Sequence, residues 1–165
     1  MPLKNAPRTA DAPGALPALR TKALDLLARR EFSRATLAKR LSPLADSAET
    51  LERLLDDLSI RQQLSDARYA ENRVNARGRR YGNDRIAHEL RQDGLDDGSI
   101  AAALANSQDE ALRCQAVWQK RFGALPDTQS ERARQQRFLR YRGFSAASIR
   151  QVLRAALEED EAGNA

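Results

Sequence analysis

The chain has 165 residues, enough for one ordinary domain or a few small repeats. Apolar residues make up 41% of it, aromatic residues 5% and charged residues 31%, a composition typical of helical proteins with wide solvated faces. The formal net charge of +5 favours a polyanionic partner, while a single cysteine and a single histidine exclude an intramolecular disulfide and leave too few ligands for a structural zinc site.

The first residues predict no regular structure and no targeting or membrane segment. Four prolines and a glycine fall between residues 2 and 17, so we expect residues 1–17 to form a disordered N-terminal arm. No apolar run approaches the length of a membrane span, and the start lacks the apolar segment of a secretory signal. Together with the lone cysteine, this predicts a cytoplasmic protein.

An internal repeat organises the rest of the chain. A shift of 49 residues carries Leu41 to Leu90 and Leu90 to Leu139. The same shift relates two further apolar series, which are Leu51, Ile100, Ile149 and Leu55, Leu104, Leu153. Three copies of one supersecondary unit explain such a pattern.

Each copy is predicted to contain three helices. The leading helices are expected at 19–30, 66–80 and 110–122, each followed by a helical pair. In the last of them, Leu112, Ala116, Val117 and Phe122 are expected to form the apolar face. We therefore predict an all-α fold, an elongated tandem array of three three-helix repeats at 18–62, 63–107 and 108–157, followed by an acidic C-terminal tail at 158–165.

Local signals place the corner of the helical pair in the second and third copies. Gly94 and Gly143 are expected to supply the left-handed residue that ends a helix, and Leu95 and Phe144 to pack back across the break. Asp96 and Ser145 are expected to cap the following helices. The first copy has Ala45 at the glycine position.

Catalytic chemistry is absent from the sequence pattern. There is no glycine-rich phosphate loop, HExxH or CxxC motif, so we expect no enzyme, no catalytic residue, no metal site and no cofactor. His88 is interpreted as solvent-facing rather than as a catalytic base, and Cys114 as a small apolar residue. Trp118 is assigned to the core, with base stacking as the alternative.

Basic residues are distributed unevenly along the chain. The first copy is close to neutral, whereas 68–91 holds seven arginines against three acidic residues and 113–154 holds ten cations against two. Arg134, Arg137 and Arg140 are spaced by three and should form one stripe along a helix. A stripe of arginines suits an extended polyanion, although a solvated helix face is the plain alternative.

These patterns yield a set of candidate partner- and DNA-binding residues in the second and third copies. Tyr141 is included because its ring could stack on a base. The candidates are Arg79, Arg80, Arg85, Arg134, Arg137, Arg140, Tyr141 and Arg142.

Three segments resemble the RecX family of bacterial regulatory proteins. They are LLARREFSRATLAKRL (26–41), LSDARYAENRVNARGRRYGNDRIAHELRQDGL (64–95) and FLRYRGFSAASIRQVL (138–153). The resemblance implies tandem three-helix repeats that bind the RecA filament on single-stranded DNA and modulate it, mainly by inhibiting its ATPase, strand exchange and SOS co-protease activities. Its setting would be homologous recombination and DNA repair.

The first copy departs from the family pattern. Phe32 stands where the family usually has a histidine, Thr36 where it has an acidic residue, and Ala45 where a glycine is expected. These changes affect the geometry expected for the first copy and any role assigned to its residues.

The expected partners are the RecA filament and single-stranded DNA, with double-stranded DNA as a further candidate. We expect the DNA to be contacted through basic repeats 2 and 3. The protein is expected to be a monomer and to bind no membrane. Capping, stripping and stabilisation of the filament remain alternatives. A competing hypothesis is a basic helical DNA-binding protein that acts without a recombinase, which predicts a steep salt dependence of binding. A third is a helical adaptor that binds protein alone, with a weak salt dependence.

Overall fold

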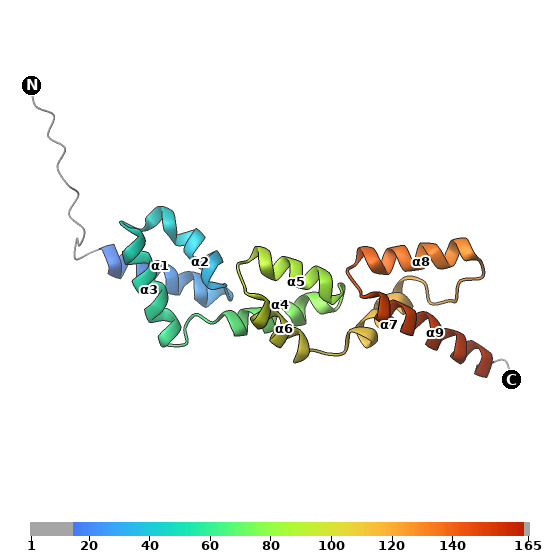
Figure 1. The fold of residues 1–165 in the computed structure, drawn as a ribbon. Coiled ribbons are helices and arrows are strands. Elements are labelled where there is room, and N and C mark those ends of the chain that lie inside the picture. The colour runs from blue at the N-terminus through green and yellow to red at the C-terminus, as the bar shows by residue number, and fades with distance from the viewer. Residues whose placement is uncertain (1–14, 164–165) are drawn as a thin grey trace, which may run out of the picture. The chain divides into compact units, whose positions relative to one another are not determined.

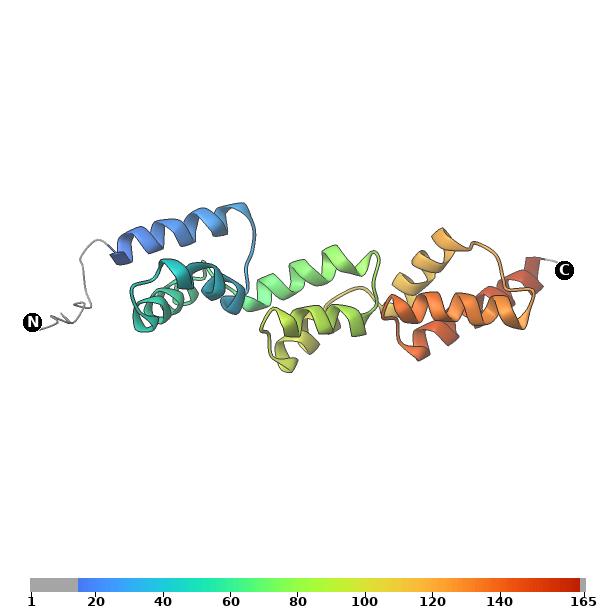
Figure 2. The ribbon, with the colours of Figure 1, turned by 90° about the horizontal axis from the view of Figure 1, so that it is seen from above.

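The computed structural model describes residues 15–163, with side chains described for 16–154. Within those residues the chain is all-α, as predicted, and contains no strand. In chain order the helices form three triplets, which Figures 1 and 2 draw from two directions. The expected N-terminal arm lies outside the described residues up to position 14.

The chain divides into two compact units, the first ending at Tyr69 and the second beginning at Ala70. The boundary falls inside helix α4, so the last two helical triplets lie almost wholly in the second unit. The first triplet consists of α1 (Ala15–Arg29), α2 (Arg34–Leu41) and α3 (Ala48–Ile60), with a 3-10 turn η1 (Ser42–Leu44). The second unit continues through α4 (Asp66–Gly78), α5 (Asn83–Gln92), α6 (Asp97–Ala105), α7 (Glu110–Arg121), α8 (Gln129–Tyr141) and α9 (Ala146–Gly163).

The repeated apolar positions form the cores. Leu41, Leu90 and Leu139 are all completely buried, one in each triplet. The core of the first unit also contains Phe32, Leu37, Leu54, Leu55, Leu58 and Leu64. The core of the third triplet consists of Cys114, Trp118, Leu139, Phe144, Ile149, Val152 and Leu153. Burial of these apolar side chains is the main source of stability in units this small.

The predicted corners are confirmed in the second and third triplets. Gly94 and Gly143 have φ values of 85° and 83°, in the left-handed region that glycine adopts without steric cost. Phe144 is buried, and its N–H donates to the Leu139 carbonyl at 3.2 Å. The Asp96 carboxylate accepts from the Ser99 N–H at 2.9 Å, as expected for an N-cap.

The first triplet turns its corner differently. Ala45 has an extended backbone, with φ −85° and ψ 139°, and follows the 3-10 turn that begins at Ser42. Ser47 then caps α3, accepting from the Thr50 N–H at 3.1 Å. No left-handed residue is needed at this corner, so Ala45 can stand where the other two copies have glycine.

Three sequence-based expectations require correction. Helix α1 begins at Ala15, inside the expected arm, because Pro17 falls in the first helical turn, where a missing N–H removes no intrahelical bond. Helix α9 continues to Gly163, past the expected boundary at 157. On α7, Leu112 is 55% exposed and Ala116 is also exposed, so these two residues were wrongly assigned to the apolar face, whereas Val117 and Phe122 pack against the core as expected.

Candidate functional site

The α8–α9 corner docks on the first turn of α5. The Gly82 N–H donates to the Arg142 carbonyl at 2.9 Å, and the Asp84 N–H donates to the Gly143 carbonyl at 3.1 Å. These donors belong to the start of α5, where N–H groups have no intrahelical acceptor. The contact is close, since a Cβ at Gly82 would lie 2.2 Å from the Gly143 oxygen. The corner glycine therefore serves both the local turn and the junction between the second and third triplets.

Glu110, the first residue of α7, fastens the same junction. Its carboxylate accepts from the Asn83 N–H at 2.7 Å and from the Ser148 hydroxyl at 2.8 Å, and more weakly from the Ser145 N–H at 3.4 Å. Burial disfavours the charged carboxylate, but the hydrogen bonds outweigh it and hold the pKa of Glu110 below its ordinary value. One acidic side chain thus joins α5, α7 and α9.

Arg113 lies inside the junction and is only 6% exposed. Its guanidinium donates to the carbonyls of Tyr81, at 3.0 Å, and Gly78, at 3.5 Å, and to the side-chain oxygen of Asn83. Burial lowers the pKa of Arg113, which nevertheless stays cationic because arginine titrates far above neutral pH. Arg113 is one of the ten cations between residues 113 and 154, but its role is structural, since its guanidinium binds carbonyls inside the junction.

A cationic hollow lies beside this junction, and we call it the junction hollow. It has a volume of about 450 Å³. Its lining is Arg79, Arg80, Ala116, Val117, Lys120, Arg121, Phe138 and Arg142. Among the described side chains, no carboxylate lies within ion-pair distance of any of its five cations.

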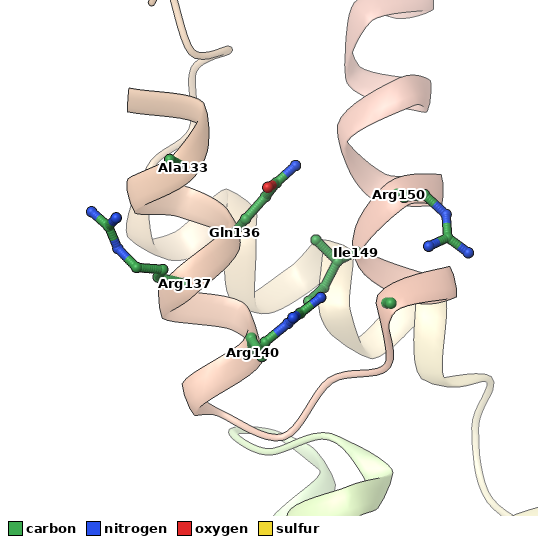
Figure 3. Close-up of a pocket in the computed structure, with 7 residues that line it drawn as sticks. Ala133, Gln136, Arg137, Arg140, Ile149 and Arg150 are labelled. Atoms are coloured by element: carbon green, nitrogen blue, oxygen red, sulfur yellow. The ribbon is translucent and has the colours of Figure 1, made fainter. Parts of the chain in front are cut away.

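A second cationic hollow, the hairpin hollow, lies between α8 and α9 and has a volume of about 350 Å³. Figure 3 shows Arg137 and Arg140 on α8, with Arg150 across from them on α9. Its other lining residues are Ala133, Gln136, Ala146 and Ile149. In the part of the chain with described side chains, these three arginines also have no carboxylate partner.

The structure divides the expected arginine stripe. Arg137 and Arg140 line the hairpin hollow, whereas Arg134 does not. Arg134 pairs with Glu131 at 3.1 Å, and its guanidinium lies 5.8 Å from the centre of the Phe122 ring. Side chains three residues apart do not lie directly above one another on an α-helix, so Arg134 and Arg140 face different surroundings.

The remaining candidates lie in different surroundings. Arg79, Arg80 and Arg142 line the junction hollow. Arg85 has an ion-pair distance of 3.5 Å to Glu89, and its guanidinium lies 4.8 Å from the centre of the Tyr81 ring. Tyr141 is 78% exposed and lines neither hollow.

Glu89 gathers several cations of the second triplet. Arg77 binds it at 2.5 Å, and Arg73 and Arg85 approach it at 3.6 and 3.5 Å. The hydrogen bond from Arg77 is the main cause of a lowered pKa for Glu89. Much of the positive charge in this triplet is therefore matched internally, which leaves Arg79 and Arg80 as its cations in the junction hollow.

Three cations that line the hollows are not among the site residues predicted from the sequence. Lys120 and Arg121 complete the junction hollow, and Arg150 completes the hairpin hollow. All three belong to the basic surplus of the third copy, but nothing in the sequence pairs them with residues on other helices. Lys120 and Arg121 lie in the last turn of α7 and Arg150 lies on α9, and only the fold places them beside the other lining residues.

Groups suited to catalysis or metal binding do not converge in the described part of the chain. No cluster of three or more metal-ligating side chains occurs there. Burial raises the pKa of the Cys114 thiol to about 12, which disfavours the reactive thiolate. His88 is exposed. None of the helices in residues 15–163 combines the length and apolar character needed to cross a membrane.

Comparison with known proteins gives concordant matches. Residues 65–104 match the family model for the second three-helix domain of RecX, and residues 108–153 match that for the third. The regulatory protein RecX of Chromobacterium violaceum is 42% identical over 142 residues, covering 86% of this chain and 93% of that protein. RecX of Neisseria meningitidis serogroup A is 37% identical, covering 86% and 93%.

Solved structures share the fold. A crystal structure of RecX from Lactobacillus salivarius matches with a TM-score of 0.78 at 18% identity, covering 87% of this chain and 97% of that chain. A second crystal structure of a regulatory protein RecX matches with a TM-score of 0.72 at 21% identity, covering 91% and 81%.

Proposed function

This chain belongs to the RecX family of regulatory proteins, and from that membership we propose that it binds the RecA filament on single-stranded DNA and inhibits it. Inhibition would extend to ATP hydrolysis, strand exchange and SOS co-protease activity. In this proposal the protein is a cytoplasmic monomer that acts by binding.

The observation that supports this proposal most directly is the hairpin hollow of the third domain. Three arginines line it, and Figure 3 shows Arg140 extending into the gap while Arg137 and Arg150 point outward from its two sides. None of them pairs with a carboxylate among the described side chains, so their charges are available to an anionic partner. Arginine forms bidentate contacts with carboxylate and phosphate, both of which a nucleoprotein filament displays. The surface therefore matches the chemistry of the proposed partner.

Inhibition of this kind requires no active site. A ligand shifts a conformational equilibrium by binding one state more tightly than the other, and 10⁴-fold preference is about 5.5 kcal/mol. A regulator that contacts the filament in only one arrangement would hold it there.

Charge reversal at Arg137 and Arg140 tests the proposal. Both side chains are exposed, so the double variant Arg137→Glu/Arg140→Glu should fold normally. We expect inhibition of RecA ATP hydrolysis to require at least about tenfold more of this variant, because two attractive contacts become repulsive. The control Lys22→Glu/Arg29→Glu makes the same charge change on exposed residues of α1. Equal inhibition by the wild type and the hairpin variant would refute the role of this hollow.

A further inference from the structure

Five cations from three separate segments converge on the junction hollow. Arg79 and Arg80 follow α4, Lys120 and Arg121 end α7, and Arg142 follows α8. Like charges brought together repel one another, and no described carboxylate forms an ion pair with any of these five cations. An anion in the hollow would relieve that repulsion, which marks the hollow as a binding site for negative charge.

The rim of the hollow is held in place by buried contacts. Arg113 donates to the carbonyls of Gly78 and Tyr81, on either side of Arg79 and Arg80. The Gly82 N–H binds the Arg142 carbonyl, tying the same segment to the end of α8. Cations on a fixed backbone lose less conformational freedom on binding a ligand, so this geometry is preorganised.

The lining favours nucleic acid over protein. Protein–protein interfaces are depleted of charge at their centre, whereas protein–nucleic acid interfaces are strongly positive. The only aromatic ring in the lining, Phe138, already has the guanidinium of Arg142 at 5.1 Å and that of Arg121 at 6.0 Å from its centre. The lining therefore offers no unoccupied ring on which a base could stack. The nucleic acid would instead be contacted through its phosphates.

We propose that the junction hollow binds the sugar–phosphate backbone of a single-stranded nucleic acid without reading its bases. The arginine guanidiniums donate hydrogen bonds to phosphate oxygens, and the apolar side chains of Ala116, Val117 and Phe138 form the rest of the lining. This deepens the proposed function by naming the surface that takes the DNA of the filament. This inference depends on the proposed function in one respect, which is the choice of a single-stranded rather than a double-stranded nucleic acid.

Removing two cations from the hollow tests the site without the recombinase. Binding of a fluorescent oligothymidylate is measured by anisotropy at several salt concentrations for the wild type and for Arg79→Gln/Lys120→Gln. Both side chains are exposed, and neither makes an ion pair with a described carboxylate, so the fold should be kept. The log–log salt slope should become shallower by about 1.4, from roughly 0.7 per phosphate contact, with about tenfold weaker binding at low salt.

The control Lys22→Gln/Arg29→Gln removes the same charge from α1 and should change the slope much less. An equal change in both variants would show a diffuse electrostatic effect and overturn the site. Wild-type affinity for the oligothymidylate together with lost inhibition of RecA would assign the hollow to a protein contact and also overturn it. Should the wild type fail to inhibit RecA while the hollow variant still loses its salt slope, the site stands and the proposed function fails.

Discussion

Substitution of Gly143 by alanine should separate the two tasks of the α8–α9 corner. Gly143 has a φ of 83°, and a Cβ there would lie 2.5 Å from the Arg85 Cβ and 2.7 Å from its backbone nitrogen. Gly94 has the corresponding conformation in the second triplet, with φ 85°, and is exposed. Gly94→Ala is therefore the control for the conformational cost alone.

The expected losses follow from these distances. A left-handed alanine costs about 1–2 kcal/mol, and both variants bear that cost. At Gly143 the new methyl group must also displace the start of α5, where two backbone hydrogen bonds to the corner contribute about 1 kcal/mol each. The free energy of unfolding should therefore fall by about 3–4 kcal/mol for Gly143→Ala and by about 1–2 kcal/mol for Gly94→Ala.

Urea unfolding followed by circular dichroism measures both values. Because the junction lies within the second compact unit, the loss should appear in the transition that reports that unit. Equal destabilisation by the two variants would show that the corner contributes nothing to the junction, and the docking argument would be refuted.

Two further predictions concern the charged side chains of Arg113 and Glu89. Arg113→Met should lower the free energy of unfolding by about 2 kcal/mol or more, because the buried Gly78 carbonyl and the partly buried Tyr81 carbonyl each lose a donor at roughly 1 kcal/mol. An unchanged urea midpoint would contradict this. Glu89 has a lowered pKa in the folded state, so its contribution to stability is complete above its unfolded pKa of 4.5 and is lost as the pH falls through the lower folded value. Glu89→Gln should therefore be less stable than the wild type at neutral pH and show a smaller loss of stability on acidification below about pH 4.5, measured by thermal melts across that range; parallel pH profiles would contradict the assignment.

Local features of the fold could be predicted from the sequence. Gly143, Phe144 and Ser145 lie next to one another, and the turn, the buried ring and the helix cap that they form depend on neighbouring residues. The apolar spacing of 49 residues likewise places Leu41, Leu90 and Leu139 in equivalent core positions. These features can be predicted because the residues that form each of them lie within one triplet.

The junction could not be predicted in this way. Arg113 finds its acceptors at Gly78 and Tyr81, more than 30 residues away, and no spacing rule connects them. The same contact removes Arg113 from the exposed cations, although its residue type suggests a surface position. Leu112 was misplaced for a related reason, since the side of α7 that is buried is set by its packing against α8 and α9.

The two hollows show the same limit for the candidate site. Arg79, Arg80 and Arg142 occur in basic stretches of the sequence and are predicted from them, but Lys120 joins them only through the packing of α7. Charge counting limits the candidate cations to one region of the chain, and the fold decides which of these cations share a surface.

The most direct measurement of the central claim is ATP hydrolysis by RecA on single-stranded DNA as the wild-type protein is added, with binding to the bare DNA followed in parallel at the same salt. The account predicts inhibition at well below one molecule per recombinase subunit, at concentrations too low to coat the DNA. Undiminished hydrolysis beside clear binding to bare DNA would contradict it and would indicate a basic helical DNA-binding protein that acts without a recombinase.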